Sequence, residues 1–132
     1  MASLRYERRI AATVDAVWDV VRHPESIPRW FPGIVSCVVE GNIRTITTAT
    51  GLQMPEENLT IDQMIRRFAY RIIAPLYRFH LGVINVIELG PLDSLCVYST
   101  TAEPDPLALI IAGGTLGALG VIQQLAEATV EE

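Results

Sequence analysis

The sequence predicts an α+β fold in which a curved antiparallel sheet of seven strands wraps around one long C-terminal helix. From Ile34 to Glu103 the chain consists of short strand-like segments, and the breaks between them carry Gly, Pro or Asp. Residues 106–132 form one apolar segment that is too long for a strand. Sequential antiparallel strands need a cover for their apolar face, and the terminal helix can supply it.

The elements follow in order. Residues 4–13 alternate loosely and predict an edge strand. Thr13 is a typical N-cap for a helix over 14–22, in which Val14, Val17, Trp18 and Val21 have helical spacing. The three prolines in residues 23–33 allow only a second short helix and a turn. The six further strands are expected at residues 34–40, 43–50, 56–62, 66–73, 79–89 and 94–103.

Composition indicates one globular domain over residues 1–132, because half of the residues are hydrophobic and only 19% are charged. The net charge is −5 and there is no basic run, so we expect no nucleic-acid partner. All ten basic residues are arginine, which excludes Schiff-base chemistry and a lysine anchor for an acidic ligand.

The two cysteines, Cys37 and Cys96, have no metal-binding spacing. Buried free thiols are the simplest interpretation, with a disulfide or a nucleophile as alternatives. The N-terminal segment has no continuous apolar run of the secretory type, so a cytoplasmic protein is expected. We expect neither a metal nor an organic cofactor.

Several motifs resemble those of one superfamily. They are "VDAVWDVVRHPESIPRWFPGIVSCVVEG", "TGLQMPEENLTID", "RRFAYRI" and "VYST". Together they are similar to the helix-grip superfamily of START lipid-transfer domains, birch-pollen-allergen proteins and the polyketide cyclase/dehydrase family. The resemblance covers nearly the whole chain. It implies a helix-grip fold with a ligand cavity between the sheet and the C-terminal helix. It does not specify a function, because proteins with this fold have many different functions.

A more distant similarity is to the plant abscisic-acid receptors, in which an SGLP turn gates the pocket. The matching residues here are Thr50, Gly51, Leu52 and Gln53. The receptors' ligand-anchoring lysine lies two residues before a cysteine that matches Cys37, and Val35 occupies that position. The resemblance therefore does not extend to binding a carboxylate hormone.

Side chains alternate between the two faces of a strand, so the family register predicts which residues line the cavity. Leu52 is expected at the gate. The predicted lining residues from the strands and the helix are Val35, Cys37, Arg44, Ile46, Thr48, Tyr70, Ile72, His80, Gly82, Ile84, Cys96, Tyr98, Thr100, Gly113, Gly117 and Val121.

Two charged groups stand out in this set. A buried arginine needs an acidic partner, so Arg44 either pairs with Glu56 or Asp62, or contacts a ligand. Glu56 and Glu57 have opposite parity, and only one can face the cavity. Asp62 is more typical of a turn cap.

Two further residues could take part in chemistry. His80 is the only histidine in a predicted strand, and it is either a hydrogen-bonded structural residue or a proton-transfer group. Tyr70 can pack in the core while offering its hydroxyl to a ligand. The candidate catalytic residues are therefore His80, Glu56, Arg44 and Tyr70.

Three functions are compatible with these features. The first is a binding or carrier protein for a small hydrophobic or lipid-like molecule. The second is a cyclase- or dehydratase-type enzyme that acts on a polyketide-like or aromatic substrate. The third is a tail-anchored membrane protein, because Leu107 to Ala126 contains no charge. The acidic flanks and the absence of an aromatic belt disfavour a membrane span.

The C-terminal helix carries a glycine stripe. Gly113, Gly114, Gly117 and Gly120 fall on one arc, which we expect to face the sheet. The opposite arc holds Ala108, Ile111, Leu119, Ile122 and Ala126. Such an apolar outer face would need a cover, which predicts a homodimer through that surface.

Overall fold

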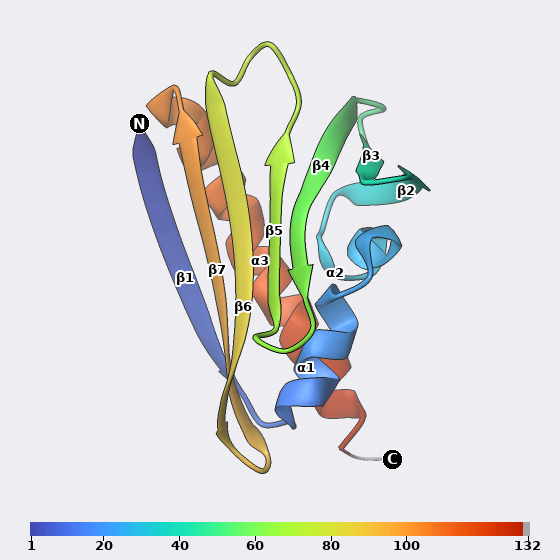
Figure 1. Cartoon of the computed structure of the whole chain (residues 1–132), viewed down its shortest axis with the longest axis vertical. Coiled ribbons are helices and arrows are strands. Elements are labelled where there is room, and N and C mark those ends of the chain that lie inside the picture. Colours follow the sequence, from blue (N-terminus) through green and yellow to red (C-terminus); the bar gives the residue numbers. More distant parts are fainter. Residues whose placement is uncertain (131–132) are drawn as a thin grey trace.

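The computed structural model describes residues 1–130 and has the predicted order of elements (Figure 1). The helices are α1 (Val14–Val21), α2 (Ile27–Trp30) and α3 (Asp105–Ala128), with a single 3₁₀ turn at Pro24–Ser26. The strands are β1 (Ala2–Ile10), β2 (Ile34–Glu40), β3 (Ile43–Thr48), β4 (Gln53–Asp62), β5 (Arg67–Ile72), β6 (Phe79–Gly90) and β7 (Asp93–Glu103). The end of the predicted C-terminal helix, residues 131–132, lies outside the described residues.

All seven strands form one antiparallel sheet in the order β1-β7-β6-β5-β4-β3-β2. Strands β2 to β7 are a continuous meander, and β1 closes the far edge by pairing with β7. α3 lies along one face of the sheet and packs on β1 and β7, while α1 and α2 lie beside it (Figure 1). The predicted fold class, a curved sheet around a long terminal helix, is confirmed.

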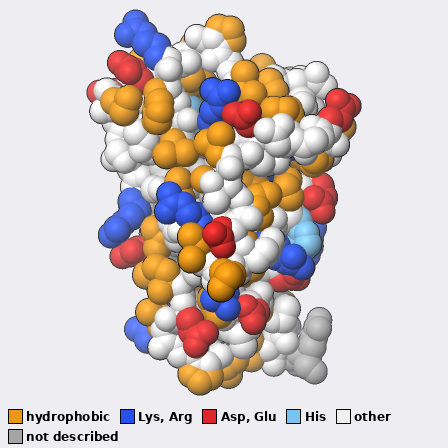
Figure 2. Space-filling model, in the orientation of Figure 1, with side chains coloured by type: hydrophobic (Ala, Val, Ile, Leu, Met, Phe, Trp, Pro, Cys, Tyr) orange, Lys and Arg blue, Asp and Glu red, His pale blue; other side chains and the backbone are white. Residues whose placement is uncertain are grey.

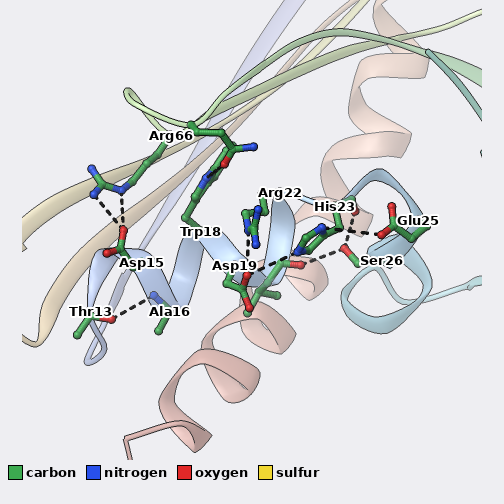
Figure 3. A network of polar contacts seen from close by, with 12 residues as sticks. Thr13, Asp15, Ala16, Trp18, Asp19, Arg22, His23, Glu25, Ser26 and Arg66 are labelled. Atoms are coloured by element: carbon green, nitrogen blue, oxygen red, sulfur yellow. Dashed lines mark hydrogen bonds and ion pairs between the residues drawn. The ribbon is translucent and has the colours of Figure 1, made fainter. Parts of the chain in front are cut away.

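Local sequence signals explain how α1 is positioned. The Thr13 hydroxyl caps the helix by accepting a hydrogen bond from the Ala16 backbone N–H (3.1 Å). Asp15 in the first turn accepts two hydrogen bonds from Arg66, which joins α1 to the β4–β5 turn (Figure 3). The Trp18 indole N–H donates to Gln63 in the same turn. These contacts fix α1 against one end of the sheet, away from the cavity described below.

Glycine is required in two of the tight turns. Gly41 between β2 and β3 has φ = +62°, and Gly51 between β3 and β4 has φ = +89°. Both lie in the left-handed region, where a Cβ atom is disfavoured. The turn that the sequence suggested as a gate therefore has a backbone that strongly favours glycine at position 51.

The predicted orientation of Val35 is wrong, because β2 contains a bulge. Ile34 pairs with Thr48 and Ser36 pairs with Thr47, so Val35 is an extra residue without a partner in β3. Its side chain is 60% exposed, whereas the Ile34 side chain is buried. A single inserted residue reverses the parity of a strand, and the sequence carried no signal for it.

The predicted faces of α3 are also wrong. The residues that face the sheet and the other helices are Ala108, Ala112, Thr115, Ala118, Leu119, Ile122 and Ala126, all at most 4% exposed. The sequence predicts four of these, Ala108, Leu119, Ile122 and Ala126, on the outer arc, but they are buried in the core, so a dimer contact through that arc is excluded. Gly113 is on the exposed side instead. Alanines, rather than the glycine stripe, supply the small surface that lets the helix approach the sheet.

Within residues 1–130, α3 is the one helix long and apolar enough to cross a bilayer by length and composition. The core helix of a globular protein meets the same criterion. In this structure the buried side of α3 packs on β1, β7, α1 and α2, as the sheet requires of its covering helix.

Candidate functional site

A cavity of about 320 Å³ lies between the sheet, the α2–β2 turn and α3. Its size is at the lower end of the range found for small-molecule sites. The cavity wall is mostly apolar and consists of Ile27, Phe31, Pro32, Gly33, Ile34, Ile46, Thr48, Met54, Glu56, Tyr70, Ile72, Ile110, Ile111 and Gly114. We call this space the inner cavity.

A second space of about 490 Å³ adjoins it at the end where the β3–β4 turn, the β5–β6 connection and the start of α3 come together. We call it the outer groove. Hydrophobic side chains reach the surface at this upper end of the molecule (Figure 2). Met54, Ile110 and Ile111 line both spaces. The remaining groove residues are Leu52, Gln53, Ala74, Pro75, Leu76, Tyr77 and Leu107.

Arg44 and Glu56 form a buried ion pair on neighbouring strands. They are cross-strand partners on β3 and β4, and the Arg44 Nε–H donates to Glu56 Oε1 (2.8 Å). Arg44 also donates from Nη1 to the Pro24 carbonyl oxygen (3.3 Å), and its guanidinium stacks on Phe68 and Tyr70. Its side chain is 0% exposed. Of the two acidic partners predicted for Arg44, Glu56 and Asp62, the structure therefore shows Glu56.

Glu56 is the member of this pair that lines the inner cavity. Burial raises the pKa of its carboxyl group above the ordinary value, and the Arg44 guanidinium acts in the opposite direction. Glu57 points outward and accepts a hydrogen bond from Arg71. Asp62 accepts hydrogen bonds from the backbone N–H groups of Met64 and Ile65, so it caps the β4–β5 turn. Of the acidic candidates, only Glu56 can act on a molecule in the cavity.

Tyr70 forms the floor of the inner cavity. Its ring lies over Gly82, where a side chain would clash, and its hydroxyl forms a hydrogen bond with the buried hydroxyl of Tyr98. Burial raises the pKa of both tyrosine hydroxyls, so both remain neutral. Tyr70 lines the cavity as predicted, while Tyr98 and Gly82 lie beneath it in the core.

His80 lies behind the cavity wall rather than in it. It is 5% exposed and packs against the rings of Tyr70 and Tyr77. The Ile72 backbone N–H donates to His80 Nδ1 (2.9 Å), so Nε2 carries the hydrogen, and this atom has no hydrogen-bond partner among the described residues. Burial lowers the pKa of His80 to about 4. These contacts match the structural role considered for His80.

The structure brings four of the predicted lining residues to the inner cavity, namely Ile46, Thr48, Tyr70 and Ile72. Leu52 is 56% exposed and lines the outer groove. Cys37 is half-buried on β2, where its thiol approaches the Pro24 carbonyl, and both Cys37 and Val121 pack on the core. Ile84, Cys96, Tyr98 and Thr100 are buried in the core. Gly113 faces open space, and Gly117 approaches Pro32. These residues were predicted to line the cavity, and the structure shows that they do not line the inner cavity.

The sequence interpretation missed the contribution of the α2–β2 turn and of three α3 residues, Ile110, Ile111 and Gly114. Phe31, Pro32, Gly33 and Ile34 line one side of the cavity. Phe31 lies against Gly114, where a Cβ atom would be 2.8 Å from the ring. The run of aromatic residues and prolines before β2 was the available signal, since rigid apolar turns over a sheet can wall a pocket.

Residues 1–130 contain no group of three or more His, Cys, Asp or Glu side chains that could hold a metal ion. Cys37 and Cys96 are free thiols, and burial raises the pKa of Cys96 to about 12, which makes it a poor nucleophile.

Comparison with solved structures gives the same fold. The protein XoxI from Bacillus cereus has a TM-score of 0.87 at 24% identity, with 94% of each chain covered. A START superfamily protein from Mycobacterium smegmatis has a TM-score of 0.79 at 15% identity, covering 96% of this chain and 98% of that one. Norcoclaurine synthase from Thalictrum flavum, solved with dopamine and hydroxybenzaldehyde, has a TM-score of 0.75 at 19% identity and covers 99% and 87%. At these identities the likeness shows the fold alone.

None of the curated proteins compared with the chain matches it. The family model described as polyketide cyclase / dehydrase and lipid transport matches residues 1–120. That match spans the sheet, the cavity and most of α3. The chain therefore belongs to the polyketide cyclase/dehydrase and lipid transport family, within the helix-grip superfamily that its motifs resemble.

Proposed function

We propose that this protein is a cytoplasmic carrier that binds a small, predominantly apolar molecule in the inner cavity. The observation that supports this is the cavity wall, in which apolar side chains surround a single carboxylate and two hydroxyl groups. The outer groove extends the apolar surface to the molecular exterior. The family description, which includes lipid transport, agrees with this function.

Ligand binding can be tested by thermal unfolding in the presence of apolar aromatic and fatty compounds. A ligand that binds the folded state raises its stability, by about 2.7 kcal/mol at a hundredfold excess over Kd. The variant Ile111→Phe should fill the cavity and remove this increase. Leu109→Phe is the matched control, because Leu109 is on the same helix but exposed. Equal ligand effects in the two variants would place binding elsewhere.

A cyclase- or dehydratase-type enzyme is the second candidate function. The supporting observation is Glu56, a carboxyl group with a raised pKa in the wall of an apolar cavity, because perturbed acids in pockets often serve as acid–base groups. An enzyme should turn over an aromatic or polyketide-like substrate and lose this turnover in Arg44→Met/Glu56→Leu, which removes the carboxyl group without leaving Arg44 unpaired. A carrier would show no turnover in either protein.

A further inference from the structure

The polar chemistry of the inner cavity depends on one residue. Of the fourteen described residues that line it, Glu56 alone carries a charge. The Tyr70 hydroxyl is already bonded to Tyr98, and the Thr48 hydroxyl is bonded within the β3–β4 turn. Any polar group of a bound molecule therefore finds its strongest partner at the Glu56 carboxylate.

Arg44 cannot serve as the counterpart of an anionic ligand. Its guanidinium lies behind the wall, where Nε is bonded to Glu56, Nη1 is bonded to the Pro24 carbonyl, and Nη2 has no hydrogen-bond partner among the described residues. It also lies over the rings of Phe68 and Tyr70. It is fully buried and does not line the inner cavity. An anion entering the cavity would therefore meet the carboxylate of Glu56 before the guanidinium of Arg44, at a cost in electrostatic repulsion.

Charge balance restricts the partner further. Arg44 and Glu56 together are neutral, so a ligand cation or anion beside them would leave a net charge in a mostly apolar space, which is costly. A neutral donor adds no charge. One carboxylate oxygen already accepts from Arg44, and a carboxylate has about four acceptor sites in total, so capacity remains for a ligand hydroxyl.

We infer that the ligand is a neutral amphipathic molecule whose hydroxyl or phenol group donates to Glu56 and whose apolar part extends past Met54 and Ile111 toward the outer groove. This inference rests on the proposed carrier function, and it narrows the ligand class to hydroxylated apolar compounds. Fatty and aromatic carboxylates at neutral pH are excluded as preferred ligands.

The test is a comparison of three probes that share an apolar tail: 4-hexylphenol, hexylbenzene and 4-hexylbenzoate. Affinities are measured at pH 7 by calorimetry. A hydrogen bond to a charged acceptor predicts that 4-hexylphenol binds about tenfold or more tightly than hexylbenzene. 4-Hexylbenzoate should bind most weakly of the three.

A variant test uses the ratio of affinities, which does not depend on the absolute strength of binding. Glu56→Gln alone would leave Arg44 unpaired and could unfold the protein, so the double variant Arg44→Met/Glu56→Leu replaces the pair with apolar side chains. In this variant the affinity ratio of 4-hexylphenol to hexylbenzene should fall to one or below, because the phenol hydroxyl no longer has a charged acceptor.

The position of the apolar tail has its own control. Leu76→Ser should weaken 4-hexylphenol but not phenol, because Leu76 lines the outer groove. Leu92→Ser, in an exposed position between β6 and β7, should change neither affinity.

The outcomes separate the two proposals. Equal binding of 4-hexylphenol and hexylbenzene, or a preference for 4-hexylbenzoate, overturns the ligand class while the carrier function stands. A phenol preference that persists in the double variant also overturns it. If none of the three probes binds the wild-type protein, both the carrier function and the ligand class fail.

Discussion

Gly82 on β6 lies directly beneath the ring of Tyr70, its cross-strand neighbour on β5. A Cβ atom at position 82 would be 2.4 Å from Tyr70 Cζ and 2.8 Å from the hydroxyl oxygen. The bare backbone at Gly82 therefore allows Tyr70 to lie flat on the sheet and reach Tyr98. The floor of the inner cavity depends on this contact.

Gly82→Ala should displace the Tyr70 ring and lower the free energy of unfolding by about 1–3 kcal/mol, the usual cost of an overpacked core. Urea unfolding measures the change. Gly90→Ala on the same strand is the control, because its Cβ atom would meet only the Asp93 Cβ, at 3.6 Å. Similar losses in both variants would mean that the strand, rather than the Tyr70 contact, requires glycine.

The two tyrosine hydroxyls should be energetically coupled. Tyr70→Phe or Tyr98→Phe alone leaves the other hydroxyl buried without its partner, which costs about 1–3 kcal/mol of unfolding free energy. The double variant removes both groups and should lose less than the sum of the two single losses. Tyr6→Phe, at a half-buried position on β1, should have little effect. Additive losses at Tyr70 and Tyr98 would contradict the coupling.

His80 should make stability depend on pH. In the unfolded chain the imidazole takes up a proton as the pH falls through 6.5, whereas the folded protein keeps it neutral until about pH 4. Because the unfolded state binds more protons in this window, stability falls as the pH is lowered. The loss due to His80 should be about 2 kcal/mol by pH 5.

His80→Asn should remove this part of the pH dependence, since asparagine does not titrate and can still accept the Ile72 N–H. Urea unfolding at pH 7.5 and pH 5 measures it. His23, which lies on the surface, offers the control His23→Asn, which should leave the His80 contribution in place. If His80→Asn kept the same slope, folding would not lower the pKa of His80.

Alanine substitutions at two adjacent glycines of α3, Gly113 and Gly114, should have different effects on the stability of the protein. Gly113 faces open space, so Gly113→Ala should stabilise the protein by about 0.5–1 kcal/mol through helix propensity. At Gly114 the new Cβ atom would be 2.8 Å from the Phe31 ring, so this ring, which lines the inner cavity, must shift. Gly114→Ala should therefore not stabilise the protein, and it should weaken ligand binding. Thermal unfolding with and without ligand compares the two, and equal gains would show that Phe31 moves freely.

The strands and the terminal helix were predictable because their signals are local. Alternating β-branched segments end at Gly, Pro or Asp, and the structure places strands at nearly the same residues. Within the site, the pairing of Arg44 with an acidic residue also followed from general rules, because an unpaired buried guanidinium is too costly.

The orientation of α3 was not predictable, because a helix that is apolar on nearly all sides carries little phase information. The small residues on both arcs could each have faced the sheet, and the alanines do so. The predicted orientation of Val35 was wrong for a different reason, because a bulge depends on how a strand pairs with its neighbour. The side chain of His80 lies on the predicted face of its strand. It does not line the inner cavity, because the rings of Tyr70 and Tyr77 pack against it.

The strand order has a consequence for synthesis of the protein. Each strand from β2 to β6 pairs with the next strand to leave the ribosome, so these hairpins can form as the chain grows. β1 is made first, but its partner is β7, with Ile10 opposite Ser94 and Ala2 opposite Ala102. The first strand therefore waits for the last one, and α3, which packs on both, can complete the core only after translation has passed nearly the whole chain.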